Sequence, residues 1–416
     1  MVLVSNFINL NMNQSKEFDI IIWGSSGFTG RLVASYFYSK YGSDGELKWA
    51  MAGRDLNKLE MVRNEVADKN IKIIIADSND SGSLMKMVKR AKVICTTVGP
   101  YANYGSMLVD ACVKSNVHYC DLTGEVQWMH KMINKHHELA KSNGTKIVHT
   151  CGFDSIPSDM GVYFIQREAE TKRGIRAKQI KMRVAGISGG ISGGTYASLS
   201  RVLEEAQKDK NIYKILSNPY SLNPNDGYVG KDKSDLRSIV YDEPSRSWIG
   251  PFIMAGINTK VVRRSNSLSN YSYGKDFRYD EATIFGKGFA GKMKGILTSI
   301  PIGIVMSVRS GSLLKKGIDM LLPKPGEGPS KKKMKTGFYN LRFYITLEDG
   351  SQAFAKVTGD MDPGYGSTSK MLAECAICLA KDKLPNSSGV LTPSVAMGES
   401  LLKRLEMNAG LTFTFE

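Results

Sequence analysis

The sequence predicts an α/β protein in which a Rossmann-type, doubly wound parallel sheet is combined with a second α/β domain of mixed sheet. Three observations lead to this class. Short apolar runs alternate with helix-like stretches over the first 150 residues, as in a parallel sheet covered by helices. A glycine-rich loop follows the first apolar run. The length of 416 residues exceeds what one ordinary hydrophobic core supports, so a second domain is expected.

The expected strands of the first domain are short and apolar. The first, at 18–23, is rich in isoleucine, as in parallel strands that are buried on both faces. Further strands are expected at 48–52, 71–76, 93–98, 118–120 and 146–150. The intervening helices are expected at 31–40, 55–69, 83–90, 104–116 and 126–143. Alternation at this spacing implies right-handed crossovers between parallel strands.

The loop after the first strand has the sequence Gly24-Ser25-Ser26-Gly27-Phe28-Thr29-Gly30. A glycine triplet alone occurs in many unrelated loops, but here it joins a strand to a helix near the start of the chain. In that context the first glycine permits a tight turn and the second lets backbone amides approach a pyrophosphate. The third lets the helix pack closely on the strand. We therefore expect these seven residues to bind a dinucleotide.

The end of the second expected strand indicates which dinucleotide is bound. Sites selective for NAD(H) usually carry a carboxylate there, which binds the ribose 2′-hydroxyl. This chain has Arg54 instead, whose guanidinium can bind a 2′-phosphate through two hydrogen bonds. We interpret the neighbouring Asp55 as the N-cap of the next helix. NADP(H) is therefore expected in preference to NAD(H).

Two further loops follow strands and lie on the same edge of the sheet as the glycine loop. Asp77 comes after the third strand, where the adenine would lie. Val98, Gly99 and Pro100 come after the fourth strand, where the nicotinamide would lie. We expect these four residues to complete the cofactor site.

A hydride-transfer enzyme also needs a proton donor or a group that stabilises negative charge near the nicotinamide. Tyr101, Asp154 and Ser155 follow strands on the cofactor edge and are our candidates for these roles. Two alternatives stay open, because Tyr101 could instead flank the cofactor and Ser155 could cap the helix that follows it. The glycine-rich segment 186–194 suits either a second phosphate cradle or a sharp turn before a helix.

Several segments taken together resemble the saccharopine dehydrogenase-like oxidoreductases, a family that includes the mycobacterial trans-acting enoyl reductases. The likeness runs from about residue 18 to the end and is most specific between 95 and 161. The segments that carry it are Gly24–Gly30, Ala52–Arg54, Val98–Tyr101, Tyr119–Glu125, Gly152–Asp159, Gly359–Tyr365 and Gly389–Ser394.

The resemblance implies a Rossmann domain, an inserted α/β domain, and a C-terminal helix that returns to the first domain. We therefore expect an N-terminal extension at 1–17 and an NADP-binding domain formed by 18–155 and 385–416. The second domain, at 156–384, would hold the substrate or form a homodimer. Because fold does not determine substrate, the resemblance does not imply saccharopine chemistry.

The net charge of +16 is concentrated in the second half of the chain. Residues 256–336 contain 16 basic and 5 acidic side chains, and the segment 286–336 combines these lysines with apolar residues. The apolar run 296–308 is too short to span a bilayer. Apolar residues bracketed by lysine and arginine suit contact of 288–316 with an anionic membrane or lipid droplet, and this is one of two open interpretations. The alternative is a core helix beside a lysine-rich loop.

Other classes of site and partner are disfavoured. Six cysteines are too few for a disulfide scaffold, and the Cys375–Cys378 pair has no second pair to complete a zinc site, so core thiols are expected. We predict no metal site. The lysines lack interleaved aromatic residues, so no nucleic-acid partner is expected. The first 17 residues lack a basic start and an unbroken apolar run, which predicts an intracellular, cytoplasmic protein. If 288–316 contacts lipid, the protein would be peripheral on a membrane or lipid droplet.

These observations leave three functional hypotheses. The first is an NADPH-dependent reductase of a lipid-linked or otherwise apolar enoyl or carbonyl substrate. The second is an amino-acid dehydrogenase of the saccharopine type, which would need arginines to hold several carboxylates. The third is a nucleotide-binding scaffold on a lipid surface that binds the cofactor without turnover.

Overall fold

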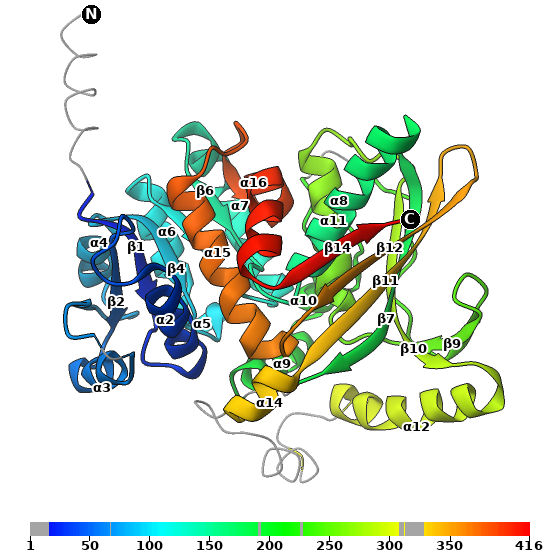
Figure 1. Ribbon diagram of the computed structural model, residues 1–416, viewed down its shortest axis with the longest axis horizontal. Helices are drawn as coiled ribbons and strands as arrows, with labels where there is room; N and C mark the ends of the chain where they lie inside the picture. The colour runs from blue at the N-terminus through cyan, green and yellow to red at the C-terminus, as the bar shows by residue number, and fades with distance from the viewer. Residues whose placement is uncertain (1–15, 67, 190–192, 225–227, 308–311, 313–327) are drawn as a thin grey trace, which may run out of the picture.

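In the described part of the chain, two seven-stranded sheets are covered by helices (Figure 1). The computed structural model describes residues 16–66, 68–189, 193–224, 228–307, 312 and 328–416. The first sheet is parallel and the second is mixed, so the expected fold class is confirmed. Residues 1–15 of the expected extension, and Arg309, Lys315 and Lys316 of the basic segment, lie outside the described residues.

The first sheet has the strand order β13-β6-β5-β4-β1-β2-β3, and every pair in it is parallel. Its strands are β1 (Phe18–Trp23), β2 (Trp49–Gly53), β3 (Lys72–Ile75), β4 (Ala91–Thr96), β5 (His118–Cys120), β6 (Lys146–Val148) and β13 (Gly389–Leu391). From β1 the strand order continues to β2 and β3 on one side and to β4, β5 and β6 on the other. In open α/β sheets the ligand crevice is expected outside the carboxyl ends of the strands at such a switch point, here β1 and β4. The cofactor loops predicted from the sequence all follow strands at this edge.

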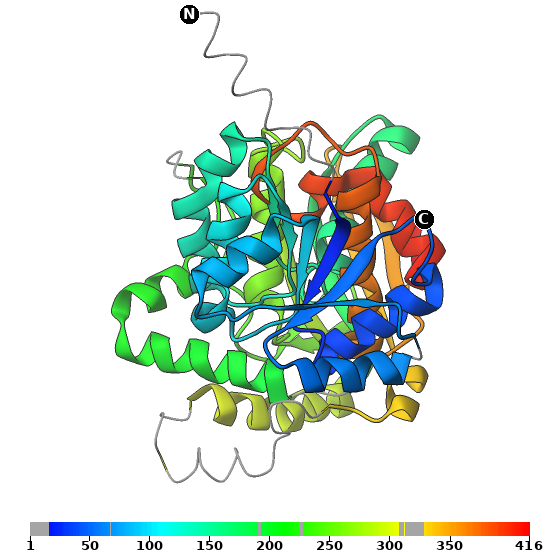
Figure 2. The ribbon, with the colours of Figure 1, turned by 90° about the vertical axis from the view of Figure 1, so that its left-hand side faces the viewer.

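Helices cover both faces of the first sheet (Figure 2). They are α2 (Phe28–Tyr41), α3 (Leu56–Val66), α4 (Ser81–Val88), α5 (Tyr101–Tyr104), α6 (Ser106–Lys114) and α7 (Val126–Ser142). The helix expected at 104–116 is instead two helices joined at Gly105, where an added Cβ would lie 2.6 Å from the Trp128 ring. β4 also ends two residues earlier than expected, so Thr97 and Val98 belong to the loop.

The second sheet has the order β14-β12-β11-β7-β10-β9-β8, in which only β7 and β10 are parallel. Its strands are β7 (Ala177–Ser188), β8 (Val240–Asp242), β9 (Ser247–Gly250), β10 (Arg278–Gly286), β11 (Phe338–Leu347), β12 (Gln352–Gly359) and β14 (Leu411–Phe415). Along β11 every second side chain from 339 to 347 is buried, as expected for a strand with one face on the core.

The remaining helices pack on this sheet or between the two domains. They are α8 (Ile156–Arg173), α9 (Gly193–Lys208), α10 (Lys210–Ser217), α11 (Ala255–Leu268), α12 (Gly288–Ser307), α14 (Lys331–Thr336), η1 (Pro363–Ser367), α15 (Thr368–Lys381) and α16 (Pro393–Asn408). The glycine-rich segment 186–194 ends β7 and begins α9, and its residues 190–192 lie outside the described ranges. None of the helices in the described part of the chain combines the length and hydropathy needed to cross a bilayer.

The structure does not divide the two domains at residue 385, where the second domain was expected to end and the chain to return to the first domain. α15, which precedes it, packs on α2, β1, β4 and β5 of the first domain. β13, which follows it, joins the first sheet beside β6, but β14 pairs with β12 in the second sheet. The chain therefore crosses between the two domains more than once before it ends.

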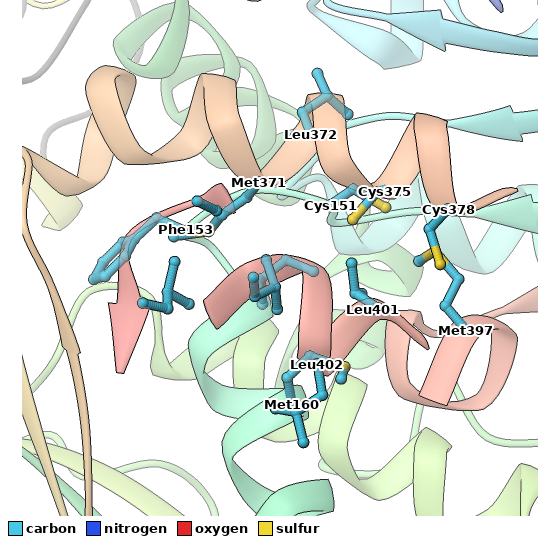
Figure 3. Close-up of a cluster of buried hydrophobic side chains, with 14 of the residues drawn as sticks. Cys151, Phe153, Met160, Met371, Leu372, Cys375, Cys378, Met397, Leu401 and Leu402 are labelled. Atoms are coloured by element: carbon cyan, nitrogen blue, oxygen red, sulfur yellow. The ribbon is translucent and has the colours of Figure 1, made fainter. Parts of the chain in front are cut away.

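A shared apolar core results from these crossings (Figure 3). Side chains from α15, α16, α8 and the segment after β6 meet in it, among them Cys151, Phe153, Met160, Cys375 and Leu401. All six cysteines are buried and free, as predicted for core thiols. Burial raises the pKa of Cys375 to about 11, so its thiol stays protonated and packs as an apolar group.

Candidate functional site

The glycine loop joins β1 to α2 in the way that the sequence predicts. Gly24 has a φ of +92°, and an added Cβ would lie 2.6 Å from a methyl group of Val98. An added Cβ on Gly30 would overlap the carbonyl oxygen of Gly24 and lie 2.8 Å from the Cα of Ser25. Both positions therefore need glycine, the first for the turn and the second for close packing of α2 on the strand end.

The amino end of α2 is open to an anion. Its N-cap is Gly27, which is exposed, makes no side-chain cap and is followed by no acidic residue in the first turn. Free backbone amides and the helix dipole at such an end favour a phosphate. The Ser25 hydroxyl donates to the backbone oxygen of Ile22 at 2.7 Å, so it shapes the loop from within, whereas Ser26 and Thr29 are half-buried.

The residues at the tip of β2 lie as the cofactor prediction requires. Arg54 is exposed, and its guanidinium has no partner within the described part of the chain. Asp55 accepts a hydrogen bond from the backbone amide of Lys58 at 3.1 Å, which confirms its interpretation as a helix cap. The carboxylate is thus occupied at the start of α3, and the arginine remains available to a 2′-phosphate.

Asp77 follows β3 at the same edge and is half-buried. Its carboxylate accepts a hydrogen bond from the backbone amide of Asn79 at 2.8 Å, and its own amide donates to Ser83 at 3.0 Å. These bonds hold the turn between β3 and α4. The adenine-side position predicted for Asp77 is consistent with this place at the strand end.

The loop after β4 is held by Glu125 from the neighbouring strand end. Glu125 is buried, and its two carboxylate oxygens accept hydrogen bonds from the backbone amides of Tyr101 and Ala102, each at 2.8 Å. Ser198 of α9 donates to the same carboxylate at 3.0 Å. Burial raises the pKa of Glu125, and these bonds oppose the rise. Val98, Gly99 and Pro100 are thereby fixed beside the glycine loop.

The structure gives Tyr101 a structural position rather than the catalytic one proposed from the sequence. The side chain is 4% exposed, and its hydroxyl donates to the backbone oxygen of Thr96 at 3.2 Å. Burial raises the pKa of this phenol well above its usual value. The hydroxyl is enclosed and already bonded within the loop, so its surroundings favour the structural alternative for Tyr101 over a catalytic role.

Asp154 and Ser155 follow β6 and differ in their surroundings. Ser155 is buried and occupies the N-cap position of α8, but its hydroxyl makes no cap hydrogen bond and instead donates to the side-chain oxygen of Asn258 at 3.1 Å. Asn258 in turn donates to Glu281 at 2.9 Å. The candidate catalytic role of Ser155 is therefore not supported, because its hydroxyl belongs to a buried polar network between α8, α11 and β10.

Asp154, by contrast, is half-buried and free of hydrogen bonds to the described residues. Its carboxylate lies beside Gly124, with Oδ2 3.4 Å from the position that a Cβ would take there. Burial raises the pKa of Asp154 to about 7. A carboxyl group with this pKa is the strongest candidate for an acid or base at the crevice.

Asp121 directly follows β5, the strand between these loops, and is fully buried. It accepts hydrogen bonds from His149 at 2.7 Å and from the Tyr119 hydroxyl at 2.8 Å. His149 also packs edge-on against Trp128. This cluster supports the loops from below. Within the described ranges, no group of three or more His, Cys, Asp and Glu side chains could hold a metal ion.

The second domain and the C-terminal segments contact the cofactor-edge loops in ways that the sequence motifs did not reveal. Tyr365 of η1 packs edge-on against Phe28 of the glycine loop, with ring centroids 5.1 Å apart. Thr368, at the start of α15, accepts a hydrogen bond from the backbone amide of Phe153 at 2.9 Å. With Ser198 on Glu125, these contacts bring η1, α15 and α9 to the cofactor edge. The segment Gly359–Tyr365 was visible in the sequence, but its partner was not.

Comparisons with known proteins agree with this geometry. Residues 20–148 match the family model for the saccharopine dehydrogenase NADP-binding domain. The cofactor of this domain is therefore NADP(H), and the glycine loop, the open end of α2 and Arg54 are suited to hold it.

Relatives at the level of sequence extend along nearly the whole chain. A protein of Mycobacterium tuberculosis, provisionally named as a trans-acting enoyl reductase, is 38% identical over 404 residues, covering 94% of this chain and 96% of the relative. The trans-acting enoyl reductase of Mycobacterium ulcerans is 35% identical over 408 residues, with the same coverage.

Two solved structures share the fold at much lower identity. Saccharopine dehydrogenase (L-Glu forming) of Saccharomyces cerevisiae superposes with a TM-score of 0.53 at 10% identity, covering 96% of this chain and 100% of that protein. Homospermidine synthase of Legionella pneumophila gives a TM-score of 0.54 at 8% identity, covering 96% and 92%. With relatives above 30% identity over almost its full length, the chain belongs to the saccharopine dehydrogenase-like family of oxidoreductases.

Proposed function

We propose that this protein is an NADPH-dependent reductase of an apolar, lipid-linked enoyl or carbonyl substrate, with Asp154 as the proton donor. Membership of an oxidoreductase family supports the reaction type, and the trans-acting enoyl reductases among its relatives support the enoyl substrate. The single observation that carries the proposal is the carboxyl group of Asp154, which is unpaired, half-buried and has a pKa near neutrality.

The backbone of the glycine loop and the open end of α2 would bind the pyrophosphate, and Arg54 would bind the 2′-phosphate. When bound, NADPH supplies a hydride to one carbon of the substrate double bond. Asp154 donates its proton to the other atom of that bond, so the two-electron reduction is balanced. Its raised pKa keeps a large fraction of this carboxyl group protonated at neutral pH.

The buried arginines of the second domain already have hydrogen-bond acceptors, which favours an apolar substrate over a polycarboxylate. Among the described residues, three arginines are buried, namely Arg183, Arg263 and Arg264. Arg183 is paired with Asp242, Arg263 is paired with Asp232, and Arg264 donates to backbone oxygens. A saccharopine-type substrate needs cationic side chains for its carboxylates, and these three already have acceptors.

The proposal is tested by oxidation of NADPH in the presence of enoyl thioesters and quinones, and by reduction of NADP+ in the presence of saccharopine. We expect turnover with an enoyl thioester or another apolar substrate, with kcat falling as pH rises through about 7 because Asp154 must be protonated. Asp154→Asn should lower kcat by about 10²–10⁴-fold and leave NADPH affinity unchanged. The exposed Asp44→Asn is the matched control.

An Asp154→Asn variant with native kcat would remove the proposed acid. Turnover with saccharopine in preference to enoyl thioesters would replace the substrate assignment with the amino-acid dehydrogenase. Binding of NADPH without its oxidation by an enoyl thioester or quinone, and without reduction of NADP+ by saccharopine, would instead favour the scaffold hypothesis.

A further inference from the structure

Over residues 288–300, where its side chains are described, helix α12 packs on the second sheet through buried glycines. Gly291 and Gly295 are buried against β10 and its neighbours. An added Cβ on Gly295 would lie 2.8 Å from the ring of Phe285 and 3.3 Å from Ile239, and one on Gly291 would overlap the carbonyl group of Gly286. The side of the helix that faces the protein is therefore its smooth, glycine-lined side.

The opposite side of α12 carries large apolar side chains that are exposed. The exposed fraction is 78% for Phe289, 65% for Leu297 and 51% for Ile300, and Met293 and Ile296 are also exposed. At 100° per residue these five positions fall within an arc of about 100° that is turned away from the glycines. A contiguous apolar stripe of this kind on a surface helix marks a contact site.

Lysines border this stripe, and acidic residues are absent from the sequence around it. Lys287, Lys292 and Lys294 are exposed, and the ammonium group of Lys292 lies 4.9 Å from the centre of the Trp248 ring. No aspartate or glutamate occurs between residues 282 and 318. Four more lysines are exposed on α14, at 331, 332, 333 and 335. The partner of this surface must therefore be anionic as well as apolar.

We propose that the exposed face of α12 docks onto an anionic lipid surface, with its apolar side chains in the acyl boundary and its lysines at the headgroups. A second copy of the chain would bring the same lysines together and be repelled. An apolar stripe edged by lysines on a helix that does not cross the bilayer has the chemistry of an interfacial helix.

The position of α12 fits this role. In Figures 1 and 2 it lies along the end of the molecule toward which the strands of the first sheet point, the end at which the cofactor loops follow those strands. A lipid surface under α12 would therefore face the same end as the crevice. The inference rests on the proposed function in one respect, because it names the surface from which an apolar substrate would be drawn.

The test is flotation of the full chain with vesicles of phosphatidylcholine mixed with phosphatidylserine, or of phosphatidylcholine alone. We expect binding to the anionic vesicles that weakens with added salt. The triple variant Phe289→Ser, Leu297→Ser, Ile300→Ser should bind at least about tenfold more weakly. Lys287→Ala and Lys294→Ala should each cost about fivefold. The matched control removes three equally exposed apolar side chains elsewhere, with Met61→Ser, Val229→Ser and Met407→Ser.

Because the changed side chains are exposed, all variants should keep the native thermal transition. Native binding by the α12 triple variant, or equal binding to neutral vesicles, would overturn the proposal. A native dimer that dissociates only in the α12 variant, without vesicle binding, would assign the face to a second copy instead. Oxidation of NADPH with a short, water-soluble enoyl thioester reports on the proposed function separately, and it should be unchanged in the α12 variant.

Discussion

Replacing Arg54 by alanine is expected to weaken the binding of NADPH about 10- to 30-fold and to leave NADH binding almost unchanged. A hydrogen bond to a charged group contributes about 1.5–3 kcal/mol. Arg54 is exposed, so solvent screening favours the lower end, about 1.5–2 kcal/mol. The guanidinium has no partner among the described residues, and Asp55 is already bonded to the amide of Lys58. Removing the Arg54 guanidinium therefore leaves none of the described protein groups without its partner.

The assay is a fluorescence or calorimetric titration of the native chain and its variants with NADPH and with NADH. Arg54→Lys, which keeps the charge but loses the two-pronged geometry, should fall between native and alanine. Arg63→Ala is the matched control, because Arg63 lies further along α3 and pairs with Glu60. The NADPH loss should shrink at high salt. Equal weakening of both cofactors would refute the contact between Arg54 and the 2′-phosphate.

Two predictions concern stability. Gly30→Ala should destabilise the fold by about 1–3 kcal/mol and reduce NADPH affinity, because the added Cβ would meet the backbone of Gly24 and Ser25. The control Gly256→Ala, whose added Cβ would enter open space, should do neither. Equal melting temperatures of the two variants would contradict this prediction. Burial raises the pKa of Glu281 from 4.5 to about 7, so the folded state holds this proton more tightly than the unfolded state. The free energy of unfolding should therefore be highest below about pH 4.5 and should fall as pH rises through about 7. Glu281→Gln should flatten that decline in chemical denaturation curves, and an unchanged slope would contradict the assignment.

Several features of the cofactor site followed from the sequence because they depend on residues that are close along the chain. A strand, a glycine loop and a helix are local, so their order predicted both the turn at Gly24 and the close packing at Gly30. The interpretation of Asp55 as a helix cap was local too. In such cases the physical requirement and the residue that meets it lie within one turn of helix.

The catalytic candidates were harder to rank, because exposure is a property of the packed molecule. Tyr101 and Ser155 follow strands at the correct edge, yet their hydroxyls are enclosed and bonded to Thr96 and Asn258. Asp154 differs from Ser155 by one position in the chain, but its carboxylate makes no hydrogen bond to the described residues, whereas the Ser155 hydroxyl does. Only the packing of α8, α11 and β10 against the first domain separates them.

The sequence by itself determined a Rossmann-type domain with an NADP(H) site, since alternating strands and helices and a glycine loop are local patterns. It also revealed the basic, apolar segment, but two arrangements of that segment remained open. Tertiary structure decided which side of α12 is buried, because the sheet accepts Gly291 and Gly295 and leaves no room for larger side chains. It also placed Tyr365 on Phe28, a contact between residues 337 positions apart that no local pattern encodes.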